Sequence, residues 1–564
     1  MTQAQWRWLA GLAATALALI ALVAAYAPRG GVTAPPPRAT VPVTILAIND
    51  FHGNLKPPRG GISIIDHADR TKRIAVPAGG AEHMATLIKQ LRSKARHSVF
   101  VAAGDLIGAS PFLSAQFHDE PTVEALSLMG LEITAVGNHE FDDGKHELLR
   151  IQNGGCHPLD GCQGPSEFKG ARFRYLAAST FDRNTGKTLL PAYEVKEFDG
   201  IPVAFIGLTL KNTPNVVSPS GVAGLEFRDE AQTINALVPE LRQRGIEAIV
   251  VLIHEGGFPV PDGECPISGA IDGIVRKLDK AVDLIVSGHT HRAYTCIVDG
   301  RLVTSADKYG TLVTEIEIEL DRKTRDLVSA RANNVLVRTD TLAKDPEQTA
   351  LIGAYEARIR PLAERKVGSI TASLSREENP AGESVLGQII ADAQLAATGP
   401  EHVDGAVIAF THPGGIRNDM PRSPDGTVTY ADLFAVQPFG NVLVTLTFTG
   451  AQIKMLLEQQ WLDQPRPRIL KVSRGFSYTW DDRRPAGNFV DGASIMLNGK
   501  PIDPGGRYRV TVNGFLADGG DNFAILREGT EPRTGVTELA ALEAYFKAND
   551  PVSPGKLDRI HRVQ

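Results

Sequence analysis

The chain has 564 residues, of which 43% are hydrophobic and 22% charged, and its formal net charge is −6. This length exceeds what one hydrophobic core serves, so we expect two large domains, and the ordinary composition excludes both extensive disorder and a protein with many membrane spans. The mildly acidic balance, without blocks of lysine and arginine, argues against a nucleic-acid polymer as partner, because such binding depends mainly on neutralising phosphates.

An uncharged apolar run, Leu9 to Ala27, follows a single arginine near the start of the chain. Its length lies between that of a secretory signal and that of a membrane-spanning helix. We therefore interpret residues 1–27 as an export segment, either a cleaved signal peptide or a single uncleaved membrane anchor. The Pro- and Gly-rich residues 28–41 predict an extended tether. The sequence thus predicts an exported protein, periplasmic or extracellular, with or without an anchor.

Four cysteines are consistent with this location, because an oxidising compartment permits disulfides and an even number can pair completely. Cys156 and Cys162 enclose a short polar loop, and Cys265 and Cys296 lie near two of the segments discussed below. A zinc site made by these cysteines is the competing interpretation, but it lacks the paired short spacing that such sites use. We predict two disulfides.

From about residue 42 to residue 340 the chain alternates β-like runs with helical stretches, which indicates an α/β domain around a central sheet. Five runs are nearly continuous in apolar residues and then reach a glycine or polar residue and a potential ligand. They are VTILAINDFHG, SVFVAAGDLIG, ITAVGNHEFDDG, AIVVLIHEGG and VDLIVSGHTHRAY. Ligands of open α/β sheets bind at the carboxyl ends of the strands, so we expect these polar side chains to converge.

Histidines concentrate in these five segments. Taken alone, a histidine or aspartate after a strand is more often a hydrogen-bonded loop residue or a helix cap than a ligand. Of the 14 histidines in the chain, however, five fall in these short stretches, which chance placement rarely produces: His52, His139, His254, His289 and His291. The collective pattern favours a metal centre.

The residue types suit two divalent cations. Such a pair, on the order of 3.5–4 Å apart, needs a bridging carboxylate and several further nitrogen or oxygen donors. Asp105 is the natural bridge. We expect the other ligands in two groups, Asp50 and His52 around one cation, and Asn138, His254 and His289 around the other. Mixed nitrogen and oxygen sites select weakly among Zn, Mn, Co and Fe, so the metals stay open.

In combination, Asp50-x-His52, Gly104-Asp105, Gly137-Asn138-His139-Glu140, His254 and Gly288-His289-Thr290-His291 resemble the signature of the calcineurin-like metallophosphoesterases. This resemblance implies a four-layer α/β/β/α domain. In that superfamily the last histidine joins the metal that carries the first Asp-x-His pair, which implies the same role for His291. Some bacterial 5′-nucleotidases have glutamine there, so His291 follows the wider superfamily more closely.

His139 differs from the other histidines because Asp142, three residues later, can hold its ring and stabilise the imidazolium form. The resembling family uses such a dyad beside the phosphate, to stabilise the transition state or to protonate the leaving oxygen. The alternative is a surface pair without chemistry. The adjacent Asn138 makes that alternative improbable.

The character of the chain changes at residues 341–365, where apolar positions interleaved with charge predict a connecting helix. Residues 366–564 are then of mixed α/β type and carry three Gly-rich segments, THPGGIRND, VQPFGN and NGFLADGGDNF. Each alone is a turn. Together they resemble the C-terminal domain of the exported 5′-nucleotidase family, which also includes nucleotide-sugar hydrolases and cyclic-nucleotide phosphodiesterases.

The resemblance implies a nucleotide-binding role for this second domain. Two aromatic rings of the family sandwich the base and an aspartate binds the ribose hydroxyls. The matching residues are Phe439 and Phe515 for the base, Asp521 for the ribose, Arg417 and Arg376 for phosphate, and Asn441 for a base contact. One position departs from the family, because His412 stands where many relatives have asparagine, five residues before Arg417.

The sequence therefore predicts a two-domain α/β enzyme with a catalytic metallophosphoesterase domain over residues 42–340 and a smaller mixed α/β nucleotide-binding domain over residues 366–564. Its predicted activity is the metal-dependent release of phosphate from nucleoside 5′-monophosphates. Hydrolysis of nucleotide sugars and of 2′,3′-cyclic nucleotides are alternatives. A non-catalytic nucleotide-binding surface protein is an alternative of another class. The sequence does not predict the oligomeric state.

Overall fold

Each of the five apolar runs that end at a potential ligand forms a buried strand in the computed structural model of the chain. The structure describes residues 39–66, 68–69, 72–260, 265–402, 404–462, 464 and 466–563. The predicted export segment and nearly all of the predicted tether lie outside these residues. Among the helices that are described, none combines the length and the apolar character needed to cross a bilayer.

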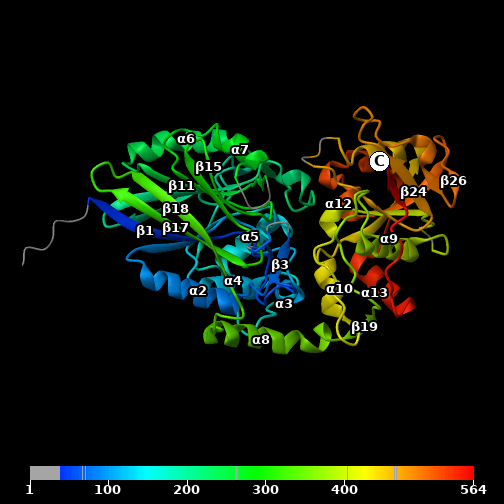
Figure 1. Cartoon of the computed structure of the whole chain (residues 1–564), viewed down its shortest axis with the longest axis horizontal. Coiled ribbons are helices and arrows are strands. Elements are labelled where there is room, and N and C mark those ends of the chain that lie inside the picture. The colour runs from blue at the N-terminus through cyan, green and yellow to red at the C-terminus, as the bar shows by residue number, and fades with distance from the viewer. Residues whose placement is uncertain are drawn as a thin grey trace, which may run out of the picture. The chain divides into compact units, whose positions relative to one another are not determined.

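Two six-stranded sheets form the centre of the first part of the chain (Figure 1). The first sheet has the order β18-β17-β1-β4-β5-β6 and the second the order β15-β16-β14-β11-β9-β8. The strands of the first sheet are β1 (Thr40–Ile48), β4 (Ser98–Ala102), β5 (Ile133–Ala135), β6 (Arg174–Leu176), β17 (Leu312–Asp321) and β18 (Leu327–Leu336). Those of the second are β8 (Tyr193–Phe198), β9 (Ile201–Thr209), β11 (Ala248–His254), β14 (Leu284–Ser287), β15 (Ala293–Val298) and β16 (Arg301–Ala306).

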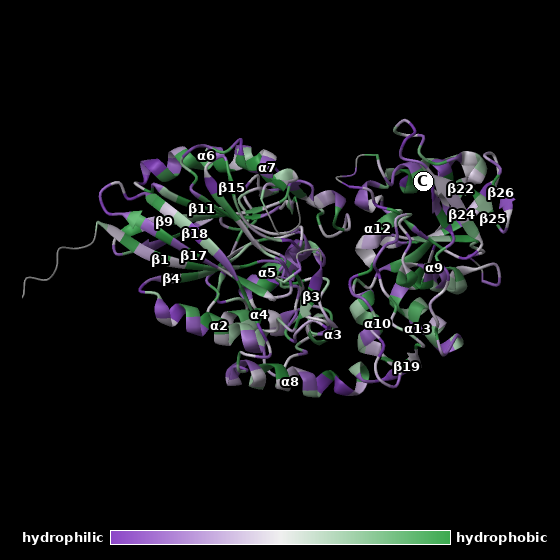
Figure 2. Ribbon diagram, in the orientation of Figure 1, coloured by the Kyte–Doolittle hydropathy of each residue, from purple (hydrophilic) through white to green (hydrophobic). Residues whose placement is uncertain are grey.

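Helices cover the outer face of each sheet. The first sheet carries α2 (Ala81–Lys94), α4 (Glu120–Met129) and α5 (Gly144–Asn153), and the second carries α6 (Glu230–Gln243) and α7 (Ala270–Val275). Between the sheets, residues such as Val43 and Ile45 of β1 meet Val203 of β9 and Val250 of β11 in one buried cluster. Figure 2 shows these inner strands as mostly hydrophobic. The layers are therefore helix, sheet, sheet and helix, as the sequence resemblance predicts.

Short elements complete this part of the chain. They are β2 (Ile62–Ile65) with β3 (Arg73–Val76), β7 (Thr180–Asp182) with β10 (Leu225–Phe227), β12 (Phe258–Pro259) with β13 (Ile267–Ser268), α3 (Phe112–Ala115), and the 3-10 turns η1 (His139–Phe141) and η2 (Thr213–Asn215). Disulfides join Cys156 to Cys162 and Cys265 to Cys296, which confirms the prediction of two disulfides.

Helix α8 (Pro346–Ala363) follows, in the stretch where the sequence predicts a connector. Asp345 caps its first turn by accepting hydrogen bonds from the backbone N–H groups of Glu347 and Gln348. The helix packs on α4, because the Gln348 side chain donates to the Ala125 carbonyl over 2.9 Å and Tyr355 donates to Glu124 over 3.1 Å. The predicted domain boundaries at residues 340, 341 and 365 stay predictions.

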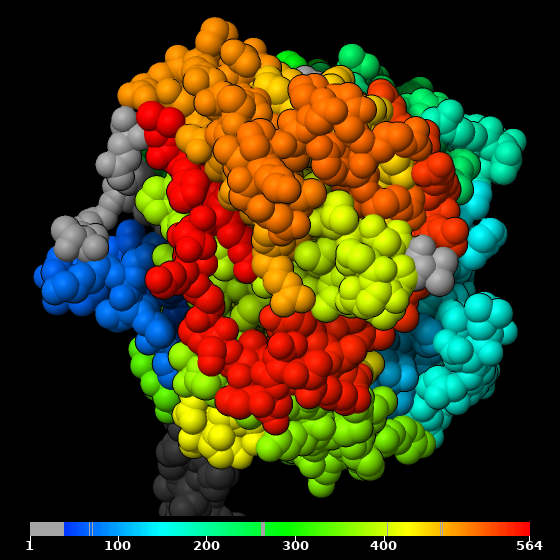
Figure 3. Space-filling view, turned by 90° about the vertical axis from the view of Figure 1, so that its right-hand side faces the viewer, coloured from blue at the N-terminus to red at the C-terminus, as the bar shows by residue number. Residues whose placement is uncertain are grey.

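The remainder of the chain is a second α/β assembly, which supplies much of the surface in Figure 3. Its five-stranded sheet has the order β23-β20-β27-β22-β28 and its four-stranded sheet the order β26-β25-β24-β29. The strands are β19 (Lys366–Ser369), β20 (Ile408–Thr411), β21 (Thr427–Thr429), β22 (Val442–Thr449), β23 (Lys471–Val472), β24 (Phe476–Trp480), β25 (Met496–Leu497), β26 (Lys500–Pro501), β27 (Arg507–Asn513), β28 (Thr530–Thr537) and β29 (Ile560–Arg562).

Helices pack against these sheets around two apolar clusters. They are α9 (Val385–Thr398), α10 (Tyr430–Val436), α11 (Gly450–Glu458), α12 (Gly514–Ala517) and α13 (Glu538–Ala548), with the 3-10 turns η3 (Pro413–Gly415), η4 (Gly492–Ser494), η5 (Gly520–Asn522) and η6 (Ala524–Glu528). Residues 41–564 form one compact unit. Within it, Phe112 of α3 lies edge-on to Tyr430 and Phe434 of α10, with ring centroids 5.4 and 5.1 Å apart.

Candidate metal centre and nucleotide site

The carboxyl ends of the inner strands bring the predicted metal ligands together. Strands β1, β4 and β5 run parallel in one sheet, and β9, β11 and β14 run parallel in the other. Backbone hydrogen bonds align the loops that follow, because the Asp50 and His52 N–H groups donate to the Gly104 and Asp105 carbonyls over 3.0 Å. The loops after β1 and β4 therefore leave the sheet side by side.

Asp105 lies between two groups of potential ligands. It belongs to one group with His254 and His289 and to another with His52 and His139, and within each group the ligand atoms lie within 4.8 Å of one another. Its Oδ1 accepts a hydrogen bond from the His139 backbone N–H over 2.9 Å, which fixes the carboxylate. The remaining oxygen, Oδ2, is 2.9 Å from His254 Nε2 and 3.7 Å from His52 Nε2.

The first group of ligands gathers Asp50, His52 and His291. His52 donates its Nδ1–H to the Gly108 carbonyl over 2.8 Å, which turns Nε2 toward the site. That nitrogen lies 3.1 Å from His291 Nε2, and His291 Nε2 lies 3.2 Å from Asp50 Oδ1. Both imidazoles are thus held with their Nε2 atoms directed at a common point.

The second group contains His254, His289 and Asn138. His254 donates Nδ1–H to the Ala103 carbonyl over 2.8 Å, so Nε2 is the ring nitrogen that faces Asp105. His289 Nδ1 lies 3.0 Å from Asn138 Oδ1, and the His289 backbone N–H donates to Asp50 over 3.0 Å. All seven residues predicted to bind metal therefore lie in one place.

The donor set fits cations. Among the residues that the structure describes, none makes a well-aligned hydrogen bond with the buried His254 Nε2, although Asp105 Oδ2 is only 2.9 Å away. Without a cation, burial lowers the pKa of His254, but the carboxylates of Asp105 and Asp50 outweigh it and raise the pKa to about 10, so a proton on Nε2 takes the place that a cation would fill. Buried nitrogen lone pairs that face carboxylate oxygens are satisfied by a divalent cation between them, and this mixture of nitrogen and oxygen donors suits zinc and its neighbours.

Glu140 supports the centre from behind, a role that the sequence reasoning did not assign. Its carboxylate accepts the backbone N–H groups of Asp105, Leu106 and Gly137 over 2.6–3.0 Å. Burial, followed by the charge of Asp105, raises its pKa to about 8. The motif GNHE could have indicated this role. Its glutamate directly follows the turn that carries the predicted ligand Asn138, so its carboxylate can accept hydrogen bonds from the backbone N–H groups of that region.

His139 and Asp142 form a hydrogen-bonded pair at the rim of the centre, with Nδ1 and Oδ2 2.7 Å apart. Both lie on or beside η1, whose turn places residues three apart on one side. Burial alone lowers the pKa of His139, but Asp142 and Asp105 outweigh it and raise the pKa. The pair is therefore arranged to hold a proton on this ring.

Arg417 and Phe439 reach this rim from the second α/β assembly. The Phe439 ring stacks on the His139 ring with centroids 5.8 Å apart and an angle of 17°. The Arg417 guanidinium carbon lies 5.7 Å from the centre of the Phe439 ring. The Nε and Nη2 atoms of Arg417 are buried, and no acceptor among the described residues pairs with them. Buried guanidinium donors without an acceptor mark a place for an anion.

Phe515 and Asp521 belong to a second group, around His412. The rings of His412 and Phe515 lie 5.1 Å apart, and His412 Nδ1 lies 2.9 Å from Asp521 Oδ2. Burial, the leading cause, lowers the pKa of His412 to about 3, so the neutral ring donates Nδ1–H to the carboxylate. Arg468 pairs with the other oxygen, Oδ1. Sequence reasoning missed Arg468, which no motif marks.

The last two predicted substrate residues make contacts within their own domain. Arg376 donates from Nη1 to the Ile416 carbonyl over 3.1 Å, directly before Arg417. Asn441 donates from Nδ2 to the buried carboxylate of Glu538 over 3.2 Å. Glu538 was not predicted. Its second oxygen accepts from Asn513 over 3.1 Å, so it links the segment of Asn441 to the segment before Phe515.

Comparison with known proteins agrees with this geometry. Residues 43–293 match the family model of the calcineurin-like phosphoesterases and residues 365–528 that of the 5′-nucleotidase C-terminal domain. The chain is 33% identical over 93% of its length to "Endonuclease YhcR" of Bacillus subtilis and 32% identical over 89% of its length to "Cell wall protein Lmo0130" of Listeria monocytogenes. It spans 41% and 66% of those two relatives.

Among solved structures, a 5′-nucleotidase precursor from Thermus thermophilus superposes with a TM-score of 0.76 at 27% identity, over 93% of this chain and 99% of that one. The two family models match successive parts of the chain, and the superposition extends over both parts. The chain therefore belongs to the 5′-nucleotidase family of metal-dependent phosphoester hydrolases, with an N-terminal calcineurin-like phosphoesterase domain and a 5′-nucleotidase C-terminal domain.

Proposed function

We propose that the protein is an exported dinuclear-metal phosphohydrolase that releases phosphate from nucleoside 5′-monophosphates. The observation that carries this proposal is the position of Arg417. Two of its buried nitrogens have no acceptor among the described residues, its guanidinium lies beside Phe439, and Phe439 stacks on His139 at the rim of the metal centre. A guanidinium that can bind an anion thus lies next to the residues that can bind cations. A phosphate ester bound between them would contact both.

A nucleotide is favoured over a smaller phosphate ester by the aromatic and hydroxyl-binding groups nearby. Phe439 and Phe515 offer faces for a base, and stacking on an aromatic ring contributes roughly 1–3 kcal/mol per base. Asp521 offers carboxylate oxygens to ribose hydroxyls. In this chain His412 and Arg468 already contact both of those oxygens, so the sugar shares Asp521 with them. The hydrogen bond from residue 412 depends on the histidine there, at the position where the resembling family often has asparagine.

Each residue has a distinct role in the proposed reaction. Arg417 binds and neutralises phosphate oxygens, and Asp142 keeps His139 oriented and protonated beside the leaving oxygen. Protonation of that oxygen by His139 lets the nucleoside depart as an alcohol. Two divalent cations would be held by seven residues and, when bound, would supply Lewis acidity toward phosphate and water; these residues are Asp50, His52, Asp105, Asn138, His254, His289 and His291.

Location and partners follow the same reasoning. The apolar run before residue 28 and the two disulfides support export to the periplasm or the extracellular space, with the N-terminal segment either removed or kept as a single anchor. The partner is a small nucleotide. A polymer of nucleic acid is disfavoured by the acidic net charge of −6.

The experiment is a substrate panel measured with and without a chelator. AMP, UDP-glucose and 2′,3′-cyclic AMP each present a base, a ribose and a phosphorus centre, but in a monoester, a pyrophosphate and a cyclic diester respectively, so their kcat/KM values rank the three candidate activities. We expect metal-dependent phosphate release from AMP to be the fastest. No metal-dependent hydrolysis of any of the three nucleotides, measured as loss of the substrate, would support the alternative of a binding protein without catalysis.

A further inference from the structure

A second group of metal-binding side chains lies outside the centre described above. His118, His157 and Asp160, called the surface cluster here, offer two imidazole nitrogens and one carboxylate oxygen within 4.8 Å of one another. They come from two segments of the chain. His118 sits in the turn between α3 and α4, and the other two residues sit in the loop closed by the Cys156–Cys162 disulfide.

The distances suit one small cation. His118 Nε2 is 2.9 Å and His157 Nδ1 is 3.3 Å from Asp160 Oδ2. Zinc binds imidazole nitrogen and carboxylate oxygen at about 2.0–2.2 Å, so donors around one tetrahedral zinc lie roughly 3.3–3.5 Å apart. Both nitrogen-to-oxygen distances therefore lie within a few tenths of an ångström of the donor separations around a zinc ion.

A backbone hydrogen bond identifies the His157 nitrogen that could bind a cation. The Asp160 backbone N–H donates to His157 Nδ1 over 3.2 Å, so this nitrogen carries a lone pair rather than a proton. The same lone pair faces the Asp160 carboxylate oxygen at 3.3 Å. A divalent cation bound here would replace the hydrogen bond from the Asp160 N–H and would lie between the nitrogen and the carboxylate oxygen.

Both sides of the surface cluster are held in place before any ion arrives. The disulfide closes the loop of His157 and Asp160, and the Gly161 N–H donates to the His157 carbonyl over 2.9 Å. On the other side, Asp119 next to His118 accepts the Gly108 N–H over 3.0 Å and the Ser114 hydroxyl over 2.5 Å. The backbone of both segments is therefore fixed, so ion binding would require movement of side chains only, which limits the entropy lost on binding.

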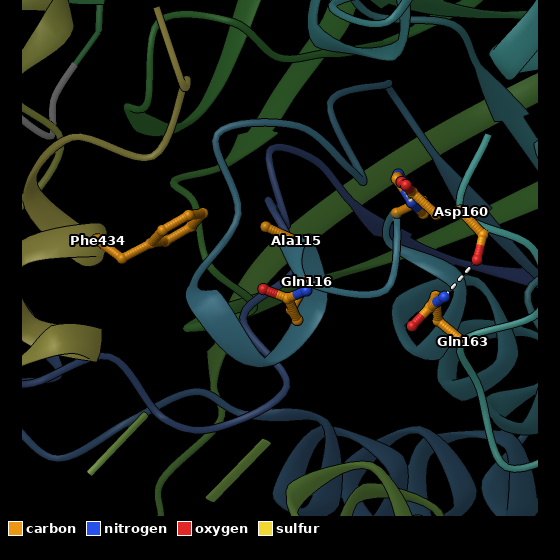
Figure 4. A pocket seen from close by; sticks show the side chains of 6 residues that line it. Ala115, Gln116, Asp160, Gln163 and Phe434 are labelled. Atoms are coloured by element: carbon orange, nitrogen blue, oxygen red, sulfur yellow. Dashed lines mark hydrogen bonds and ion pairs between the residues drawn. The ribbon is translucent and has the colours of Figure 1, made fainter. Parts of the chain in front are cut away.

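A cavity of about 310 Å³ opens beside the cluster and gives an ion and its waters a way in (Figure 4). Its lining includes His118 and Asp160 of the surface cluster, together with Ala115, Gln116, Gln163 and Phe434. Figure 4 shows Asp160 bonded to Gln163, and Gln163 donates to the Asp160 backbone carbonyl rather than to its carboxylate. The Asp160 side chain, 55% exposed, stays available.

We propose that His118, His157 and Asp160 bind a third divalent cation of the zinc class, with water in the remaining position. Two imidazoles and one carboxylate with an open position match the ligand chemistry of zinc, and copper and nickel share it. The His118 and His157 rings now stack 3.7 Å apart at 10°. An imidazole binds a metal in its own plane, so binding turns the rings apart toward the cavity.

Such an ion joins the disulfide loop to the turn that supports the metal centre. The chain of contacts runs from His118 to its neighbour Asp119, from Asp119 to the Gly108 N–H, and from the Gly108 carbonyl to His52. A cation at the surface cluster therefore cross-links two segments on the outside of the centre. Its role is structural, because the cluster shares no residue with the proposed ligands of the other two metals.

The test compares the zinc content of the full-length protein with that of a His157→Ala variant. Both proteins are saturated with zinc chloride, desalted, and analysed by elemental mass spectrometry. We expect the unmodified protein to retain one zinc per chain more than the variant. His146→Ala, which removes an exposed histidine of helix α5, is the matched control and should keep the full zinc content. Equal zinc contents in all three proteins would overturn the proposal.

A second measurement protects the test against a folding defect. Asp160→Asn changes a half-exposed side chain without changing its shape, and it should lose the same zinc while keeping the circular dichroism spectrum of the parent. Crystals of the parent soaked in zinc chloride should show an anomalous peak bounded by His118, His157 and Asp160. Peaks at the dinuclear centre with none at the surface cluster would also overturn the proposal, because the crystal then shows zinc binding without this site.

Discussion

Phe439 stacks on His139, with the two ring centroids 5.8 Å apart and the ring planes only 17° from parallel. Phe439 follows α10 in the second domain, whereas His139 is the proposed acid at the end of β5 in the first. The contact therefore ties the predicted base-binding ring to the predicted chemistry. It also explains why neither domain alone contains the complete site.

This contact gives a first prediction about substrate selectivity. Phe439→Ala and Phe515→Ala should each raise KM for AMP by roughly 10-fold, which corresponds to about 1.4 kcal/mol of lost stacking. Hydrolysis of p-nitrophenyl phosphate should change little, because that ester has no base to stack. Steady-state kinetics on both substrates are the measurement. Equal losses on the two substrates would show that the rings support the fold rather than the nucleotide.

The second prediction concerns the bridging carboxylate. Asp105→Asn should lose most of the bound metal and nearly all turnover, because one uncharged amide replaces the group between the two sets of donors. Elemental analysis of the purified variant checks this. Two metals per chain at full occupancy in Asp105→Asn would remove Asp105 from its proposed role.

Removal of the imidazole at residue 139 gives the third prediction. His139→Ala should lower kcat by about 10²–10⁴ while metal content stays nearly intact, because the residue is proposed to act on the leaving oxygen. Its ring also lies within ligand distance of His52 and Asp105. A variant that loses metal together with activity would therefore place His139 among the ligands.

Arg417 supports a fourth prediction, in which catalytic activity falls while thermal stability stays the same. Arg417→Ala should lower kcat/KM for AMP by about 10–100-fold, since a charged hydrogen bond to phosphate contributes roughly 1.5–3 kcal/mol. The melting temperature should not fall, because Nε and Nη2 have no partner to lose within the described part of the chain. Arg422→Ala is the control on the same segment, since the Arg422 guanidinium donates to the nearby Ser423 and Pro424 carbonyls. A matched drop in activity there would contradict the assignment.

A fifth prediction tests the ion pair that follows α8. Arg365 donates to both oxygens of Glu543, and this hydrogen bond is the main cause that lowers the pKa of Glu543 from 4.5 to about 2. A depressed carboxyl pKa stabilises the fold above the unfolded-state value and loses that effect as pH falls. Glu543→Gln should therefore reduce the free energy of unfolding by up to about 1 kcal/mol at pH 7.

The pH dependence distinguishes this effect from a general packing loss. The difference in unfolding free energy between parent and Glu543→Gln should shrink between pH 5 and pH 2, as Glu543 takes up its proton in the folded protein. Urea unfolding at several pH values measures it. A difference that stays constant over this range would mean that the charge of Glu543 does not stabilise the fold.

The sequence was most informative where one strand supplies one ligand. Strands such as β11 are buried along their whole length and end at His254, so an apolar run that stops at a histidine reports both the strand and the position of its last side chain. The relation of Asp521 to Arg468 was not predictable in this way. The two residues are far apart in the chain and meet through tertiary packing. Periodic patterns in the local sequence carry no information about such contacts.

The same limit applies to polar groups buried behind the site. Glu538 fixes Asn441 and Asn513 from the start of α13, although a glutamate at the start of a helix usually faces water. Its burial follows from the docking of α13 on the sheet. Likewise, the unpaired nitrogens of Arg417 depend on what lies around the guanidinium, and the motif GGIR shows only that an arginine is present.

Five of the seven proposed metal ligands adopt a left-handed backbone conformation, with φ from 45° to 69°: Asp50, His52, Asp105, His289 and His291. For residues other than glycine this conformation costs on the order of 1–2 kcal/mol each. A directed-evolution library screened for heat resistance alone should therefore accumulate glycine at these positions. The most heat-resistant clones from such a screen would no longer bind metal. Each round of selection therefore has to require catalytic turnover as well.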